Sequence, residues 1–327
     1  MTLLSIWEEF EALALDDSTG ALTALRLLGA GTHFLAKGLA GEPVLLLRAG
    51  KRRVPRIPLG LRHVQVEFEV DCTVQDTSGD ATAAPVSATF CRAVCDPATP
   101  SLHPLFVHAL SGAVECLPAE LSPGEADRFF DDVLELFRAF AVPARTSVLG
   151  LWGELFIIAV SPCREAFVTG WHVLPDQAFD FAFPNAYLEV KATARQNRQH
   201  EFALTQLRGT HLPVFVASIV AELSDAGETI FDLASAIQGD LTPANRAKLW
   251  RLVAESVGGD VDGAGELRIL RTAATNSLRF YSASMLPAPD VPAVLMPCIS
   301  SVRFSLDLDR VQNLLSLSEG EVWLALT

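Results

Sequence analysis

The chain has 327 residues, 50% of them hydrophobic, and a formal net charge of −14. It contains no apolar run of the ~18 residues that a membrane-spanning helix needs. Its acidic start, with Glu8, Glu9 and Glu11, is unlike a secretory signal. The acidity also argues against strong non-specific binding to nucleic acid, which depends on many lysines and arginines. We therefore expect a cytoplasmic protein with two or three domains.

Residues 1–120 are predicted to form a mostly β domain after a short N-terminal helix. The segment LRHVQVEFEVD alternates apolar and polar residues, which is typical of a half-buried strand. Residues 42–50 and 86–94 are further strand candidates, and the small, polar residues 73–85 predict a loop. A basic cluster in this region either contacts phosphates or forms a solvated face; it consists of Lys51, Arg52, Arg53, Arg56 and Arg62.

Residues 121–225 are predicted to form the core of the protein, and 226–327 a C-terminal α+β region. A helix over 125–141 follows Pro123–Gly124, and a second helix is capped by Thr146 or Ser147. Three strand-like segments come next, at 164–173, 176–183 and 186–193, followed by a short helix near 204–210 and a strand over 213–223. In the C-terminal region we expect helices over 229–238 and 242–257 and a strand over 302–311.

The segment FDFAFPNAYLEVK, residues 179–191, places three charged residues among apolar ones. If Pro184–Asn185 forms the turn, paired residue numbers sum to 369 and Asp180 faces Glu189, with Cβ atoms ~5 Å apart. Lys191 lies on the same face as Glu189, since strand side chains alternate. Adjacent carboxylates repel each other, and a divalent cation such as Mg²⁺ removes that cost. The alternative is an exposed hairpin face with a cross-strand salt bridge.

A second unusual charge is Glu154, in the segment SVLGLWGELFIIAV. It is the only formally charged residue between Arg145 and Arg164, in a helix that is apolar nearly all round and hence buried. Glu154 is therefore either paired with a core arginine such as Arg145 or directed at a functional site.

The motifs GLWGEL, FDF and LEVKAT resemble the PD-(D/E)XK nuclease superfamily, and more narrowly an uncharacterised bacterial family of it that is often encoded near phage-defence genes. The resemblance implies a restriction-endonuclease-like αβββαβ core with a mixed central sheet, within an α+β or α/β fold. It also implies that Asp180, Glu189 and the carbonyl of Val190 bind Mg²⁺, with Mn²⁺ as a substitute, and that Glu154 completes this site. Lys191 would position or activate the attacking water, and Gln206 would be a further catalytic residue. Pro175–Asp176 spells the first letters of the motif, so Asp176 is an alternative to Asp180.

The function implied is Mg²⁺-dependent hydrolysis of nucleic acid, with DNA as the expected substrate and phage defence or restriction as the expected setting. Proteins of a defence system are the expected partners besides nucleic acid. The alternative is a catalytically inactive subunit of the same fold that binds DNA or protein. A locally basic segment beside the hairpin could contact phosphates; it contains Arg195, Arg198, His200, Arg208 and His211.

Overall fold

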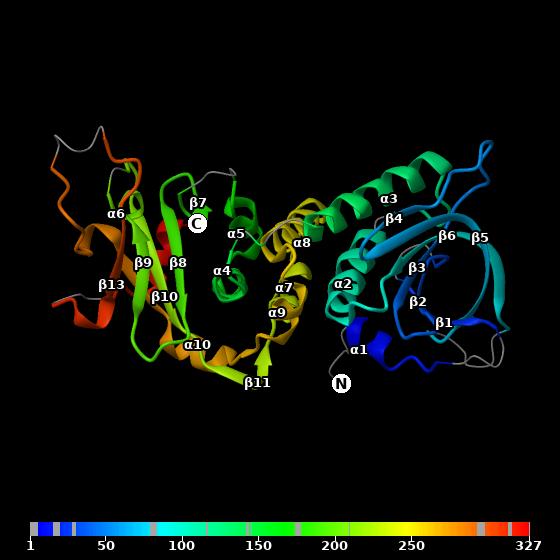
Figure 1. The fold of residues 1–327 in the computed structure, drawn as a ribbon, viewed down its shortest axis with the longest axis horizontal. Coiled ribbons are helices and arrows are strands. Elements are labelled where there is room, and N and C mark those ends of the chain that lie inside the picture. The colour runs from blue at the N-terminus through cyan, green and yellow to red at the C-terminus, as the bar shows by residue number, and fades with distance from the viewer. Residues whose placement is uncertain are drawn as a thin grey trace. The chain divides into compact units, whose positions relative to one another are not determined.

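The computed structural model describes most of the chain: residues 6–15, 20–27, 31–78, 84–115, 117–141, 144, 146–173, 178–208, 210–292, 298–312 and 316–326. The chain divides into two compact units, Met1–Arg145 with Arg246–Asp262 (unit 1) and Thr146–Asn245 with Gly263–Thr327 (unit 2). Helices and strands are mixed in both units (Figure 1). Over the described ranges, no helix is both long enough and apolar enough to cross a membrane.

Unit 1 is built on a closed mixed sheet, whose strands follow one another in the order β1-β2-β3-β6-β5-β4. A parallel pairing of β1 with β5 closes the sheet, and its other pairings are antiparallel. The apolar side chains of its core include Phe34, Leu46 and Phe90. The strands are β1 (Leu22–Arg26), β2 (Phe34–Lys37), β3 (Pro43–Arg48), β4 (Leu59–Leu61), β5 (Val64–Asp76) and β6 (Val86–Cys95).

The helices of unit 1 include α3, whose start the sequence signals clearly. Ser122 accepts a hydrogen bond from the backbone of Glu125, and the Glu125 side chain accepts from the backbone of Ser122, which is a capping box. The predicted helix over 125–141 and the predicted strands over 42–50, 61–71 and 86–94 are confirmed. Residues 73–76 of the predicted loop, however, belong to β5. The helices are α1 (Ile6–Glu11), η1 (Pro100–Leu102), α2 (His103–Val114), α3 (Pro123–Arg138) and η2 (Ala139–Ala141), while α8 (Pro243–Val257) and α9 (Val261–Glu266) run across the division between the units.

Unit 2 contains a four-stranded mixed sheet in the order β12-β10-β8-β7. Strands β8 (Tyr187–Thr193) and β10 (Val214–Val220) are parallel, while β7 (Phe181–Ala182) and β12 (Arg279–Ser282) pair antiparallel to their neighbours. A separate two-stranded sheet joins β9 (Gln199–Ala203) to β13 (Arg303–Asp307). Strand β11 (Leu223–Glu228) makes single bridges to Ile269.

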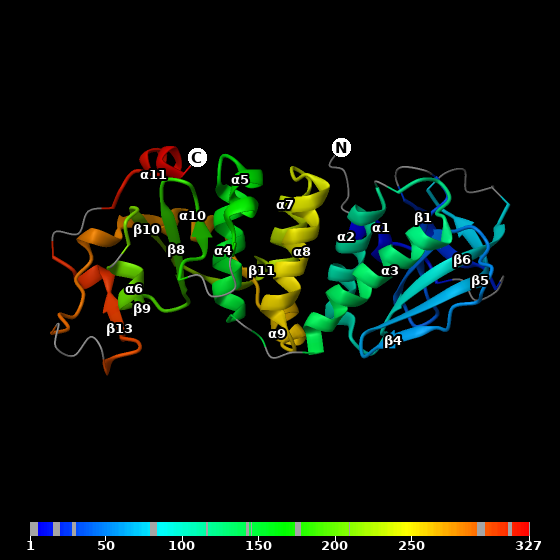
Figure 2. The ribbon, with the colours of Figure 1, turned by 90° about the horizontal axis from the view of Figure 1, so that it is seen from above.

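The sheet of unit 2 is packed on both faces. Helix α4 (Val148–Val160) lies against β8 on one face, as Figure 2 shows from above. The other face carries a second apolar cluster that includes Phe202, Val216 and Tyr281. The remaining helices are α5 (Arg164–Gly170), α6 (Leu204–Leu207), α7 (Ile230–Gln238), α10 (Arg271–Ser277), η3 (Ala283–Met285), η5 (Leu308–Arg310) and α11 (Glu319–Leu326).

One predicted strand is wrong, because residues 164–170 form helix α5. Their aromatic and β-branched residues favour a strand, but tertiary packing decides otherwise: the ring of Phe167 packs against Phe181, Phe183 and Trp323. Three strands, β7, β8 and β9, still lie between α5 and α6. The third of them pairs with β13 and not with β8.

The expected division into three regions at residues 120 and 225 remains a prediction. The two compact units reflect which parts of the chain contact each other. The prediction concerns which regions fold independently, and this is a different property of the chain.

Candidate functional site

The hairpin of β7 and β8 has the predicted register. Phe181 pairs with Leu188 and Ala182 with Tyr187, so the paired residue numbers sum to 369. The backbone N–H of Phe183 donates to the carbonyl of Ala186 (2.9 Å), which closes the turn at Pro184–Asn185. This register places Asp180, the residue before β7, beside the middle of β8.

Asp180 is fixed to the β8 backbone. The N–H of Val190 donates to Oδ2 of Asp180 at 2.7 Å. The negative charge of Glu189 contributes to a raised pKa of Asp180 at this position.

Glu189 is 3% exposed and forms an ion pair with the neighbouring lysine of the motif. Oε1 of Glu189 lies 2.7 Å from Nζ of Lys191 and accepts a hydrogen bond from Nε2 of Gln206 at 2.6 Å. Oε2 of Glu189 is buried and has no hydrogen-bond partner among the described residues. A buried carboxylate oxygen without a partner is costly, so a ligand for this atom would stabilise the site.

Alternation along β8 separates the charged residues from the helix-packing ones. A Cβ built on Gly153 of α4 would lie 3.0 Å from Cβ of Ala192 and 3.4 Å from Cγ1 of Val190, so these two residues face α4. Glu189 and Lys191 therefore point to the opposite face, where Nζ of Lys191 lies 5.3 Å from the centroid of the Phe202 ring.

Glu154 lies in the buried face of α4 and is directed at the site. Its Oε2 accepts a hydrogen bond from Nε1 of Trp171 (2.7 Å) and lies 2.8 Å from Nε2 of His172. Arg145, the core partner that the sequence suggested, lies outside the described residues. The described partners of Glu154 are thus an indole and an imidazole.

No motif in the sequence pointed to Trp171 and His172. They follow α5, and they reach Glu154 because Trp171 bridges Phe181 of β7 and the N–H of His172 donates to the carbonyl of Asp180 (3.0 Å). The sequence pattern predicts a strand over 164–173, and an extended strand would not turn after residue 170 to bring these two side chains to α4.

Two of the carboxyl groups and one imidazole are close enough to hold a cation together. One ligand atom from each of Glu154, His172 and Asp180 lies within 4.8 Å of the others. The pKa of Asp180 lies well above its usual range because packing removes hydration and because the charges of Glu189 and Glu154 are near. Burial also raises the pKa of Glu189, which Lys191 and Gln206 partly offset. A divalent cation would relieve this repulsion, so the residues fit a metal ion.

The structure brings together the predicted site residues that it describes. Glu189 contacts Lys191 and Gln206, and Asp180 bonds to the backbone N–H of Val190. Glu154 joins them by its approach to Asp180 within 4.8 Å. Asp176, the alternative to Asp180, lies outside the described residues.

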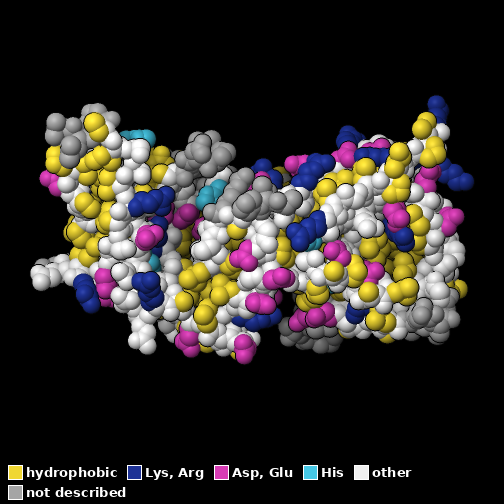
Figure 3. All heavy atoms as spheres, viewed as in Figure 1, with side chains coloured by type: hydrophobic (Ala, Val, Ile, Leu, Met, Phe, Trp, Pro, Cys, Tyr) yellow, Lys and Arg dark blue, Asp and Glu magenta, His cyan; other side chains and the backbone are white. Residues whose placement is uncertain are grey.

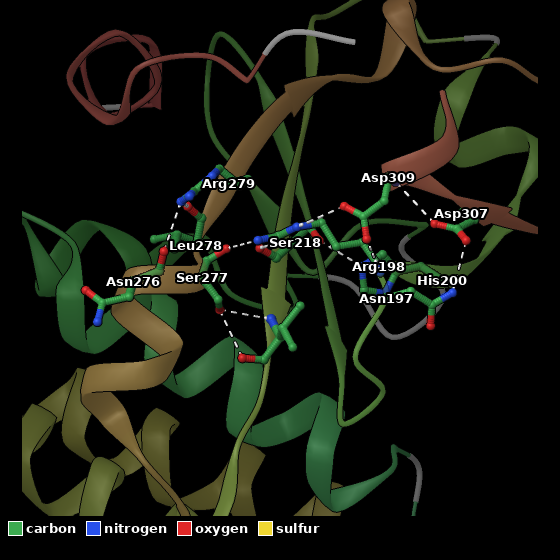
Figure 4. Close-up of polar contacts among 11 residues, drawn as sticks. Asn197, Arg198, His200, Ser218, Asn276, Ser277, Leu278, Arg279, Asp307 and Asp309 are labelled. Carbon is green, nitrogen blue, oxygen red and sulfur yellow. Dashed lines mark hydrogen bonds and ion pairs between the residues drawn. The ribbon is translucent and has the colours of Figure 1, made fainter. Parts of the chain in front are cut away.

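Part of the basic segment beside the site is buried and serves the fold. Nη1 of Arg198 donates to the carbonyl (2.9 Å) and to Oγ (3.0 Å) of Ser218, and Nη2 donates to the carbonyl of Ser277 (Figure 4). His200 Nε2 lies 2.8 Å from the same Ser218 Oγ. Arg198 and His200 are 9% and 5% exposed, so they connect β9 to β10 and are not available to phosphates. Arg195 and His211 are exposed.

The basic cluster of unit 1 is partly neutralised. Arg52 and Arg56 both pair with Asp127, and they lie over the ring of Phe68 at 4.5 and 4.8 Å from its centroid. On the face drawn in Figure 3, basic side chains of the described residues are interspersed with acidic and apolar ones. The cluster therefore resembles a solvated face more than a continuous phosphate-binding band.

The fold and the site together define a mixed α and β protein with buried carboxylates beside a lysine on a central strand. A family model described as "Putative PD-(D/E)XK family member, (DUF4420)" matches residues 132–309. The chain belongs to this family, as the sequence motifs implied. No curated protein and no solved structure matches the chain. Family membership makes nuclease chemistry the first function to consider.

Proposed function

We propose that the chain is a divalent-metal-dependent nuclease that hydrolyses phosphodiester bonds of nucleic acid, with DNA as its substrate. The observation that carries the proposal is the pairing of Lys191 with Glu189 at 2.7 Å, beside the carboxyl groups of Asp180 and Glu154. Acid-x-Lys on a strand opposite a second acid is the pattern that gives the family its name. A role in phage defence or restriction is part of the proposal and rests on the sequence resemblance.

In this proposal the segment from α4 to β10 is the nuclease core. Its chain order, with α4 and α5 before β7, β8 and β9 and with α6 before β10, supports an αβββαβ arrangement. The parallel pairing of β8 and β10 gives the mixed sheet that such a core requires.

Asp180, Glu189 and Glu154 would hold the metal ion, with the carbonyl of Val190 as a further oxygen ligand. Oε2 of Glu189, which has no hydrogen-bond partner in the described part of the chain, and the three ligand atoms within 4.8 Å are the features that fit such an ion. When bound, the ion would polarise the phosphate and lower the pKa of a bound water.

The other residues act on the nucleophile and on the carboxylates. Lys191 places an ammonium group at the site, where it orients a water molecule and stabilises negative charge that develops on the phosphate. Gln206 holds Glu189 by its 2.6 Å hydrogen bond, and the indole of Trp171 holds Glu154. These bonds fix the carboxylates before any substrate arrives.

Cleavage of labelled duplex DNA, single-stranded DNA and RNA by the purified full-length chain tests the proposal. We expect cleavage with Mg²⁺ or Mn²⁺ and none after chelation. Lys191→Met and Glu189→Gln should each lower the rate by about 100-fold or more, the size typical of losing one electrostatic contact to a transition state.

Glu201→Gln is the matched control for Glu189→Gln. Glu201 is an exposed glutamate on β9, in the same unit, and its change should leave the rate unaltered. Cleavage that persists in Glu189→Gln would contradict the proposed site. A folded wild-type chain that binds these nucleic acids without cutting them would instead support the inactive subunit.

A further inference from the structure

His172 stands at the site although none of the sequence motifs includes it. Its Nε2 lies 2.8 Å from Oε2 of Glu154. One ring nitrogen of His172, one carboxylate oxygen of Glu154 and one of Asp180 also lie within 4.8 Å of one another. An imidazole nitrogen and two carboxylate oxygens therefore lie close together, and these are donor types that bind first-row transition metals.

The backbone holds His172 in an unusual conformation to achieve this. Its φ is +41°, in the left-handed region that residues other than glycine rarely adopt. The conformation is maintained by the antiparallel bridge of Trp171 to Phe181, of which the hydrogen bond from His172 N–H to the carbonyl of Asp180 (3.0 Å) is part. Local strain of this kind persists where surrounding structure enforces it, which is frequent at functional sites.

We propose that His172 is a ligand of the metal ion, so that the site takes a first-row transition cation in preference to Mg²⁺. This inference rests on the proposed metal-dependent function. Mg²⁺ binds almost entirely through oxygen, whereas an imidazole nitrogen adds affinity for cations such as Co²⁺, Fe²⁺ and Zn²⁺. The addition of an imidazole to the carboxylates thus gives the site a different cation preference from carboxylates alone.

The test compares binding of Co²⁺ and of Mg²⁺ by calorimetry, and examines the Mn²⁺-loaded protein by pulsed electron paramagnetic resonance. The wild type should bind Co²⁺ at least about tenfold more tightly than Mg²⁺, and its Mn²⁺ spectrum should show coupling to ¹⁴N. His172→Asn should weaken Co²⁺ binding about tenfold or more, change Mg²⁺ binding by less than about threefold, and abolish the ¹⁴N coupling.

Asparagine is chosen because it tolerates positive φ, so the variant keeps the backbone of the turn. His211→Asn, at an exposed histidine of the same unit, is the control and should bind both ions as the wild type does. The inference is overturned if the wild type binds Mn²⁺ without ¹⁴N coupling, if the coupling survives in His172→Asn, or if the folded wild type binds no Co²⁺.

The same samples separate this inference from the proposed function. Cleavage that depends on Glu189 without ¹⁴N coupling would support the nuclease and overturn the role of His172. Coupling to ¹⁴N in a chain that binds the nucleic acids and cuts none of them would support the ligand and contradict the nuclease.

Discussion

Glu189 and its neighbours illustrate how single charged residues can indicate a functional site in a sequence. Charges inside an apolar strand are costly unless something compensates for them, and the alternation of a strand fixes which of them share a face. The turn residues Pro184–Asn185 then set the register, and the observed pairing of Phe181 with Leu188 agrees with it. His172 escaped prediction because its position depends on a bridge between segments and on a rare φ, and neither leaves a pattern in the sequence.

His200 is expected to make the protein sensitive to mild acid. Burial lowers the pKa of His200 from its ordinary value of 6.5 to about 4, and the positive charges of Lys191 and Arg198 add to this effect. As the pH falls below 6.5, the unfolded chain binds a proton that the folded chain refuses, so stability falls until the pH reaches about 4. The loss is at most about 3 kcal/mol, since each unit of pKa difference corresponds to about 1.4 kcal/mol.

Urea unfolding at several pH values, for the wild type and for His200→Gln, measures this contribution. Glutamine can still bond to Ser218 but does not titrate, so its free energy of unfolding should decline less steeply between pH 6.5 and about 4. His211→Gln, at an exposed position, should keep the wild-type slope. Equal slopes for the wild type and His200→Gln would contradict the assignment.

At the scale of elements, the contact of α4 with β8 depends on Gly153. Glycine in a helix costs about 1 kcal/mol relative to alanine, so its presence here needs a reason. That reason is the approach of the strand: an added Cβ would lie 3.0 Å from Cβ of Ala192. Because Glu154 is the next residue of α4, this packing also sets the distance of its carboxyl group from the hairpin.

Gly153→Ala should therefore destabilise the chain by about 1–2 kcal/mol, because overpacking exceeds the gain in helix propensity. Gly124→Ala, in α3, is the matched control: an added Cβ there meets nothing within 4 Å, so it should stabilise by up to about 1 kcal/mol. Thermal and urea unfolding of the two variants give the comparison. Stabilisation by both changes would show that α4 and β8 can move apart without cost.

At the scale of the whole molecule, regular local patterns were predictable and long-range pairings were not. The capping residues of α3 and α4, the alternating strands β5 and β6 and the hairpin all follow from short stretches of sequence. The closure of the sheet by β1 and β5 and the pairing of β9 with β13 join residues about 50 and 100 positions apart. No local pattern encodes such pairings, and packing of Phe167 likewise decided that 164–170 is a helix.

Metal binding is expected to protect one unit of the molecule. Every proposed ligand lies in unit 2, and at a metal concentration 100 times the Kd the bound state gains about 2.7 kcal/mol. Hydrogen exchange followed by mass spectrometry should show slower exchange in peptides from 146–173 and 178–193 on addition of the metal. Peptides from the sheet of unit 1 should exchange at an unchanged rate, and Glu189→Gln should remove the protection. Equally slowed hydrogen exchange in both units would show that the metal does not bind specifically at the proposed site.

The bridge of Trp171 to Phe181 has a consequence beyond the placing of His172. An open sheet exposes unpaired backbone groups along its outermost strands, and these invite pairing with other chains and aggregation. The sheet of unit 1 closes on itself, whereas that of unit 2 ends in β7 and β12. Among the described residues, Trp171 forms a bridge to Phe181 of β7 and Leu317 forms a bridge to Phe280 of β12, so each edge is paired at one position. The turn that directs an imidazole toward the acidic cluster thus also pairs with part of a sheet edge, so a substitution there would alter both the proposed metal site and the exposure of that edge.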